Sequence, residues 1–183
     1  MKATIDIIGN GSSNNLYRKT GFVVVACNVP QHKYDYDYLS IIDNNPIVWM
    51  KQNNYTPRKP VLCLRKNKAT ANAKEIKGEW RDVYPDRERW NSGLHAAEYF
   101  APTYNEIHLW GMDSFYCDDF TSQMDDIIER KIRPNLNKWW RPAWMSIFDE
   151  HVKTQFIIHI PEGECCDFKK ENVIVRQESL AVA

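Results

Sequence analysis

With 183 residues the chain has the length of one ordinary domain, and its 24 Lys and Arg balance its 24 Asp and Glu. A chain without net charge has no overall field that would draw it to nucleic acid or to an anionic membrane. Its apolar runs are far shorter than the roughly 20 residues needed to cross a bilayer, and the amino terminus lacks the pattern of a signal sequence. We therefore expect a cytoplasmic protein that does not bind membranes.

The cysteines Cys27, Cys63, Cys117, Cys165 and Cys166 form no CxxC pair. Cys165 and Cys166 are adjacent, which places them poorly for a disulfide with each other or for a shared tetrahedral zinc site. Free cysteine commonly packs as a small apolar side chain. We expect reduced thiols and no metal site.

The amino-terminal part of the chain predicts a compact βαβ unit. Residues 4–8 and 22–27 are short, β-branched and almost continuously apolar, as in parallel strands that are covered on both faces. Between them there is room for a turn and a short helix that closes at Thr20-Gly21.

Residues 47–50 and 61–64 predict two further strands, each after a proline whose missing N–H is tolerated at a strand start. The alternating Tyr and Asp of residues 34–38 indicate an exposed helix start, with a cation site as the alternative. Residues 58–77 are locally basic, with Glu75 as their single acid. This stretch is either a solvated loop and helix surface or a contact for nucleic acid.

The rest of the chain continues the alternation. Residues 92–101 predict a helix, and 106–111 a strand that ends at glycine. Residues 120–132 predict another helix, because apolar residues recur at helical spacing and the acids precede the basic residues, as suits the helix dipole. Residues 156–161 predict a strand, and 173–175 an edge strand.

Alternating strands and helices are typical of the α/β class. We expect a single Rossmann-like domain over residues 1–164, with a mainly parallel sheet flanked by helices, and a C-terminal strand and tail over 165–183. The Trp139, Trp140 and Trp144 side chains either form a lid that stacks on a base or sugar, or pack a helix onto the sheet.

A glycine-rich turn follows the first predicted strand and comprises Gly9, Asn10, Gly11, Ser12 and Ser13. Backbone without side chains lets N–H groups approach a phosphate, and the start of the next helix adds its dipole. In open α/β sheets this is where ligands collect. The third glycine of the dinucleotide fingerprint and the Walker motif are both missing. The turn is therefore a candidate nucleotide site, or a tight turn without a ligand.

A second helix start repeats this pattern. Asn91-Ser92-Gly93 places a capping side chain and bare N–H groups at the predicted helix 92–101. Asp113 follows the strand 106–111 and should lie at the carboxyl edge of the sheet, beside the first turn. It could bind a ribose hydroxyl or a cation, or it could order the turn.

Taken in order, four segments resemble the core of bacterial sialyltransferases and of the related proteins known as sialyltransferase-like or archaeal pterin-diphosphokinase-like. The segments are residues 7–13, 25–28, 91–93 and 106–116. In that family the turn usually reads Gly-Asn-Gly-Pro-Ser, whereas this chain has Ser12 in place of the proline.

The resemblance implies a nucleotide site and a metal-independent reaction, with a histidine further along the chain acting as general base. The implied nucleotide contacts are Asn10, Gly11, Ser12, Asn28, Ser92, Gly93 and Tyr116.

Two histidines, His151 and His159, follow the Gly-x-Asp segment and are candidates for that base, because imidazole titrates close to neutrality. Neither lies in a motif of the family, and His159 falls within an apolar predicted strand. With Asp113, they are the candidate catalytic residues.

Three functions are open at this point. The first is a glycosyltransferase that moves a sugar from a nucleotide sugar to an unknown hydroxyl acceptor without a cofactor. The second is ATP-dependent diphosphate transfer, which would need Mg²⁺ and carboxylates such as Asp113 with Asp118 or Asp119. The third is a protein that binds or sequesters a nucleotide without turnover.

Overall fold

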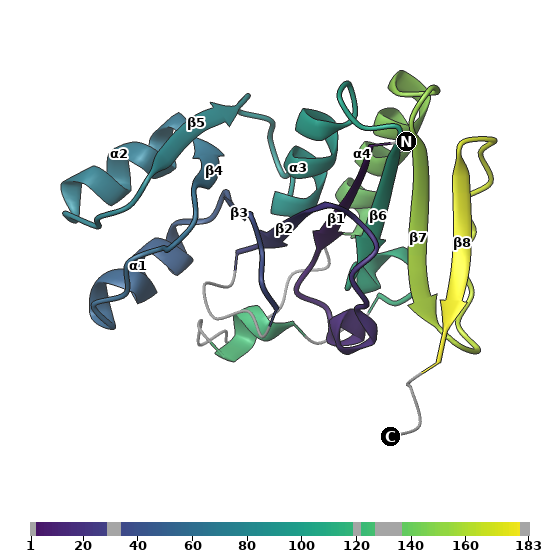
Figure 1. Ribbon diagram of the computed structural model, residues 1–183, viewed down its shortest axis with the longest axis horizontal. Helices are drawn as coiled ribbons and strands as arrows, with labels where there is room; N and C mark the ends of the chain where they lie inside the picture. Colours follow the sequence, from purple (N-terminus) through teal and green to yellow (C-terminus); the bar gives the residue numbers. More distant parts are fainter. Residues whose placement is uncertain (1–2, 29–33, 119–121, 127–136, 180–183) are drawn as a thin grey trace.

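The computed structural model describes residues 3–28, 34–118, 122–126 and 137–179. Within these ranges eight strands form one sheet in which every neighbouring pair is parallel, in the order β5-β4-β3-β2-β1-β6-β7-β8 (Figure 1). The strands are β1 (Thr4–Ile8), β2 (Val23–Cys27), β3 (Tyr38–Ile41), β4 (Val61–Leu64), β5 (Trp80–Tyr84), β6 (Glu106–Trp110), β7 (Gln155–Pro161) and β8 (Val173–Glu178). The expected Rossmann-like α/β class is confirmed.

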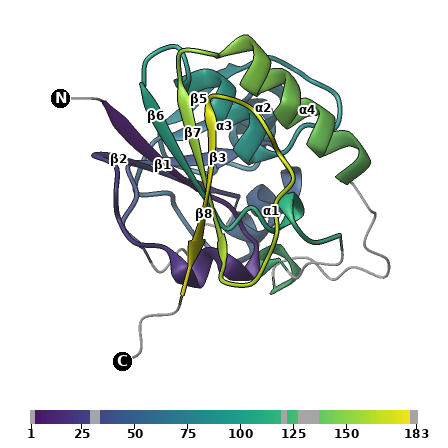
Figure 2. The same ribbon diagram turned by 90° about the vertical axis from the view of Figure 1, so that its right-hand side faces the viewer.

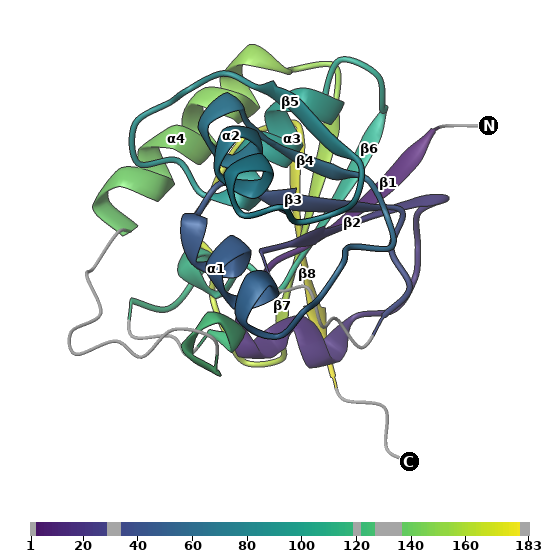
Figure 3. The same ribbon diagram turned by 90° about the vertical axis from the view of Figure 1, so that its left-hand side faces the viewer.

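Helices cover both faces of this sheet. They are α1 (Asn44–Gln52), α2 (Arg65–Ala73), α3 (Ser92–Phe100) and α4 (Asn137–Glu150), with short 3-10 segments η1 (Ser12–Leu16), η2 (Asp113–Phe115) and η3 (Gln123–Asp126). α3 and α4 pack beside each other on one face (Figure 2). α1 and α2 pack together on the other face, at the end of the sheet that holds β3 to β5 (Figure 3).

The order of the strands reverses at β1. From β1 to β5 the chain moves steadily toward one edge, and β6 then returns to pair with the other side of β1. The chain leaves β1 toward β2 on one side and leaves β6 toward β7 on the other, so the connections that follow these two adjacent strands run in opposite directions. This switch point is where open α/β sheets bind ligands.

The central strands are apolar on both faces, because both faces are covered. Ile5 and Ile7 of β1 point into the core below α3 and α4, whereas Ile8 points to the opposite face, where it packs with Trp110. All three isoleucines are fully buried. This explains why β1 has isoleucines on both faces instead of the alternation of a half-exposed strand, with the buried Asp6 as its one charged residue.

One predicted strand is wrong. Residues 47–50 lie in α1, where Ile47 and Met50 are fully buried and the two residues between them are partly exposed. Burial at a spacing of three indicates a helix. Pro46 lies in the first helical turn, where its missing N–H is tolerated as well as it is at a strand start.

Most of the other predicted elements that lie in the described residues are confirmed. The helix 92–101 and the strands 4–8, 22–27, 61–64, 106–111, 156–161 and 173–175 are all present, with boundaries shifted by a few residues. Most of the helix predicted over 120–132 lies outside the described residues. The helix start expected at 34–38 is wrong, since this segment leads into β3, and β5 had not been predicted. None of the helices that the structure describes has the length and apolar composition of a membrane-spanning segment.

Candidate functional site

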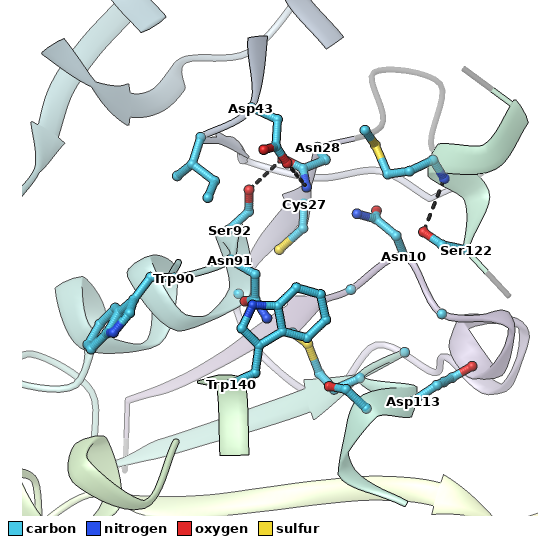
Figure 4. Close-up of a pocket in the computed structure, with 18 of the residues that line it drawn as sticks. Asn10, Cys27, Asn28, Asp43, Trp90, Asn91, Ser92, Asp113, Ser122 and Trp140 are labelled. Carbon is cyan, nitrogen blue, oxygen red and sulfur yellow. Dashed lines mark hydrogen bonds between the residues drawn. The ribbon is translucent and has the colours of Figure 1, made fainter. Parts of the chain in front are cut away.

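A cavity of about 260 Å³ opens at the carboxyl ends of β1, β2, β3 and β6, directly at the switch point (Figure 4). Its walls come from the turn after β1, the loop after β6, the start of α3 and one residue of α4. The predicted site residues Gly9, Asn10, Gly11, Asn28, Ser92, Gly93 and Asp113 all line it. The fold thus brings together predicted site residues that are more than 100 positions apart in the sequence.

The glycines of the first turn allow it to pack tightly against the loop after β6. The Gly9 N–H donates to the Trp110 carbonyl at 2.7 Å, and the Gly11 N–H donates to the Gly111 carbonyl at 2.9 Å. A Cβ on Gly9 would overlap the Gly111 carbonyl oxygen, and a Cβ on Gly11 would overlap the Asp113 carboxylate. Close packing of two loops, in addition to any ligand, therefore requires glycine here.

Asp113 fastens this turn rather than facing the cavity. Its carboxylate accepts hydrogen bonds from the Ser12 hydroxyl at 3.0 Å, from the Ser13 hydroxyl and from the Ser13 N–H at 3.3 Å. Figure 4 shows the side chain turned toward η1, away from the centre of the cavity. Asp113 is 3 % exposed, so these donors stabilise a carboxylate that would otherwise be costly to bury. Ser12 and Ser13 serve the same contact and are not among the described residues that line the cavity.

Asn10 carries the one buried side-chain oxygen of this cavity wall that lacks a partner in the described structure. Its Oδ1 is inaccessible to solvent and accepts no hydrogen bond. Buried polar atoms are almost always paired, and an exception calls for an explanation such as an unseen ligand. The Asn10 side chain as a whole is partly exposed and lines the cavity (Figure 4), so rotation of its terminal amide would present a polar atom to a ligand.

Asn28 joins the end of β2 to the start of α3. It adopts a left-handed backbone conformation with φ of 55°, which asparagine tolerates better than most residues. The Ser92 hydroxyl donates to its Oδ1 at 2.5 Å, and its Nδ2 lies 3.4 Å from Oδ2 of Asp43 (Figure 4). The amide is thus held in place by two neighbours, and Nδ2 keeps a second hydrogen for another acceptor.

The amino terminus of α3 points its backbone donors at the cavity. The Asn91 side chain caps the helix by accepting from the Leu94 N–H at 2.9 Å. The N–H groups of Ser92 and Gly93 precede the first intrahelical hydrogen bond and have no acceptor within the helix. With the positive end of the helix dipole, they form a site suited to a phosphate.

Trp140 of α4 forms another wall of the cavity. Its indole N–H donates to the Arg89 carbonyl at 3.0 Å, and Arg89 has a left-handed φ of 63°. Trp144 on the same helix is fully buried against the sheet, whereas Trp139 is 42 % exposed. The interpretation that this tryptophan segment packs a helix onto the sheet therefore holds for Trp144, and the stacking of Trp140 on a base or sugar stays a prediction.

The remaining predicted site residues lie elsewhere. Tyr116 is half-buried, its pKa is raised by burial, and it is not among the described residues that line the cavity. His151 follows the end of α4, just before β7, at the amino end of the sheet and so at the end opposite to the cavity.

His159 points into the face of the sheet opposite to α3 and α4. Its ring stacks on Trp110 with centroids 3.5 Å apart. Its Nε2 lies 2.9 Å from Nδ1 of His108, and its Nδ1 lies 2.7 Å from Glu178. His108 in turn contacts Glu106 at 2.8 Å. Strand pleating sends these side chains to a buried structural network, which sequence position alone does not reveal.

Several lining residues escaped the sequence analysis, namely Asp43, Arg89, Trp90 and Met112. Asp43 follows β3, a strand that was not predicted, so its place at the carboxyl edge gave no signal. Arg89 and Trp90 precede the predicted helix at 92, and a pattern of exposed aromatic and basic residues just before a helix start is too common to single out.

The structure gives less support for the metal ion and the nucleic acid that the sequence left open as ligands. No three His, Cys, Asp or Glu side chains of the described residues converge on a metal position. Asp118 is engaged by the Asn137 amide at 2.7 Å, and Asp119 lies outside the described residues. In the basic stretch 58–77, Lys66 pairs with Asp86 at 3.1 Å and Lys68 with Asp82 at 3.3 Å, so part of its positive charge is compensated.

No family model, curated protein or solved structure matches the chain.

Proposed function

We propose that the cavity binds the nucleotide part of a nucleotide sugar and that the protein transfers the sugar to a hydroxyl acceptor. The observation that carries this proposal is the set of unengaged polar groups around one cavity at the switch point. They are the backbone donors of Ser92 and Gly93 at the start of α3 and the unpaired Oδ1 of Asn10. The donors suit a phosphate, and the acceptor suits an amino or hydroxyl group of a nucleoside.

The size and wall of the cavity support the same assignment. Its volume of about 260 Å³ lies near the lower end of the usual range for ligand pockets, roughly 300 Å³ upward. It would enclose part of a nucleotide sugar and leave the rest at its mouth. Trp140 offers a large flat surface there, fixed by its hydrogen bond to the Arg89 carbonyl.

We place this activity in the cytoplasm. None of the five cysteines, all of which the structure describes, forms a disulfide, and two of them, Cys27 and Cys63, are buried. Free cysteines at this number fit a reducing compartment.

The proposal is tested by a thermal-shift screen against CMP, UDP, GDP, ATP and their sugar conjugates, with and without Mg²⁺. A ligand that binds only the folded state raises the apparent stability. We expect one nucleotide to raise the melting temperature of the wild type and to lose this effect in Asn10→Ala. The control is Asn53→Ala, which removes an exposed amide at the end of α1, outside the cavity. No shift with any nucleotide, or an equal shift in Asn10→Ala, would contradict the proposal.

Binding without turnover is a second candidate, favoured by one observation. The carboxylate of Asp113 and the amide of Asn28 are already engaged in protein hydrogen bonds, as in a preformed binding site. Incubation of the protein with the donor that the screen identifies separates the two. If the intact donor is recovered from a tight complex after incubation with every acceptor tested, this result would support binding without turnover.

A further inference from the structure

A second cavity, of about 550 Å³, adjoins the first at the carboxyl ends of β3, β4 and β5. Four residues line both cavities, namely Ile42, Asp43, Arg89 and Trp90. The two cavities are therefore neighbours along the carboxyl edge of the sheet and share these four residues. The walls of the second cavity alone come from Leu64, Lys66, Asp86, Arg87 and Glu88.

Ion pairs line this second cavity. Lys66 contacts Asp86 at 3.1 Å, and Arg89 contacts Glu88 at 3.1 Å. Arg87 forms a bidentate ion pair with Glu98 of α3. Its Nε donates to one carboxylate oxygen at 3.2 Å, and its Nη2 donates to the other. Each of these cations thus faces an acid, so the wall offers many hydrogen-bonding groups without a surplus of positive charge. An anionic polymer would need uncompensated cations, whereas a neutral compound rich in hydroxyls needs donors and acceptors of both kinds.

Trp90 adds a flat apolar surface where the two cavities join. The Arg87 guanidinium lies 4.7 Å from the centre of its ring, which fixes the indole in place. Convergent polar groups around an aromatic surface are a usual composition for a small-molecule site.

Asp43 is the one acid among the described residues that line both cavities. It precedes α1 as the N-cap, yet its side chain makes no capping hydrogen bond to the helix. Its Oδ2 instead lies 3.4 Å from Nδ2 of Asn28 in the wall of the first cavity (Figure 4). The carboxylate is therefore held at the place where a donor in the first cavity and a compound in the second would meet.

We propose that the second cavity holds the acceptor, a saccharide or another neutral polyhydroxy compound, and that Asp43 is the general base for its attacking hydroxyl. This inference rests on the function proposed above. The Asp43 carboxylate takes the proton of the acceptor hydroxyl. At the same time the oxygen of this hydroxyl forms a bond to the anomeric carbon of the donor. The bond from that carbon to the phosphate oxygen breaks, the nucleotide leaves with the electron pair, and the proton on Asp43 passes to water.

The first test uses the donor identified by the thermal-shift screen with a panel of methyl glycosides of hexoses and N-acetylhexosamines as acceptors. Removal of a general base typically costs at least about 100-fold in rate. We expect Asp43→Asn to lower kcat for transfer by that factor with a smaller change in the acceptor KM, and Asp43→Glu to recover part of the rate. Transfer by Asp43→Asn at the wild-type rate would overturn the inference, whereas donor binding with no transfer by the wild type to any glycoside would overturn the proposed transferase function and this inference with it.

The second test fills the second cavity. Glu88→Trp places a large side chain in its wall, and Glu79→Trp places the same side chain before β5, outside both cavities. We expect Glu88→Trp to raise the acceptor KM relative to the donor KM by about 10-fold or more, and Glu79→Trp to behave as the wild type. If the ratio of acceptor KM to donor KM is the same in the two variants, the acceptor binds outside the second cavity. If instead no nucleotide binds to the wild type, the proposed function itself fails, so the two failures are distinguishable.

Discussion

Two buried carboxylates fix the short connection between β1 and β2. Asp113 holds its beginning through Ser12 and Ser13. Asp6, fully buried in β1, holds its end by accepting hydrogen bonds from the Thr20 N–H at 2.9 Å and the Gly21 N–H at 2.8 Å. Both acids therefore do structural work, and a 3-10 segment of one to two turns suffices where most parallel connections use a full helix.

His95 of α3 is buried without partners for its ring nitrogens. It is 1 % exposed, stacks on Tyr84 with centroids 5.1 Å apart, and neither nitrogen has a hydrogen-bond partner. Burial lowers its pKa to about 4. The folded state thus holds a neutral imidazole at pH values where the unfolded chain has taken up a proton.

We expect this histidine to make the fold sensitive to mild acid. The free energy of unfolding is highest above the pKa of His95 in the unfolded chain, about 6.5. It falls as the pH falls from 6.5 to about 4, the pKa in the folded state, and below that pH His95 causes no further loss. The loss amounts to about 3 kcal/mol over this window. Urea unfolding at a series of pH values measures it. His95→Phe, which keeps an aromatic ring without titratable nitrogens, should flatten the curve, and an unchanged slope in this variant would assign the effect to other groups.

At the scale of the element, local sequence signals predicted the strands that contain short apolar runs. β1, β2, β4, β6 and β7 are mostly buried strands of this kind, and the edge strand β8 was predicted from Val173, Ile174 and Val175. β3 was missed because its four residues include Ser40, which is fully buried but forms hydrogen bonds to the start of α3 and to Tyr84. β5 was missed because Arg81 and Asp82 in its centre are exposed at the edge of the sheet. These strands depend on tertiary neighbours that a local pattern does not contain.

The cap of α3 offers a test of how this helix start serves the cavity. Asn91→Ala removes the acceptor for the Leu94 N–H, and we expect the free energy of unfolding to fall by about 1 kcal/mol. The stabilisation by the nucleotide should fall as well, because the donors of Ser92 and Gly93 are no longer held by an ordered first turn. Chemical denaturation with and without the nucleotide measures both effects. A variant that loses stability and keeps the full nucleotide effect would show that the cap is structural only.

At the scale of the whole molecule, the sequence located one part of the lining of the two cavities. The turn after β1, the end of β2 and the start of α3 were predicted because each adjoins an element with a clear pattern. The other part, with Asp43 and Trp90, follows from the positions of β3 to β5 and could not be assembled without them. The candidate histidines were misleading for a related reason, since strand pleating and helix direction decide which end and which face of the sheet a side chain reaches.

The contacts of His108 and His159 have a consequence for the stability of the fold in acid. Glu106, His108, His159 and Glu178 make a chain of three contacts that ends on β8. Burial lowers the pKa of His159 to about 4, although the contact with Glu178 opposes this shift. The folded state therefore holds a neutral imidazole at pH values where the unfolded chain has taken up a proton.

We therefore expect His159, like His95, to make the fold less stable in mild acid. The free energy of unfolding should fall as the pH falls from about 6.5 to about 4, because the unfolded state then binds more protons. His159→Phe keeps an aromatic ring beside Trp110 and removes the titratable group, so it should reduce this slope. Urea unfolding of the His95 and His159 variants and of the double variant separates the two contributions, and a slope in His159→Phe equal to that of the wild type would contradict the expectation. If it is confirmed, two buried imidazoles on opposite faces of the sheet set the acid stability of the fold.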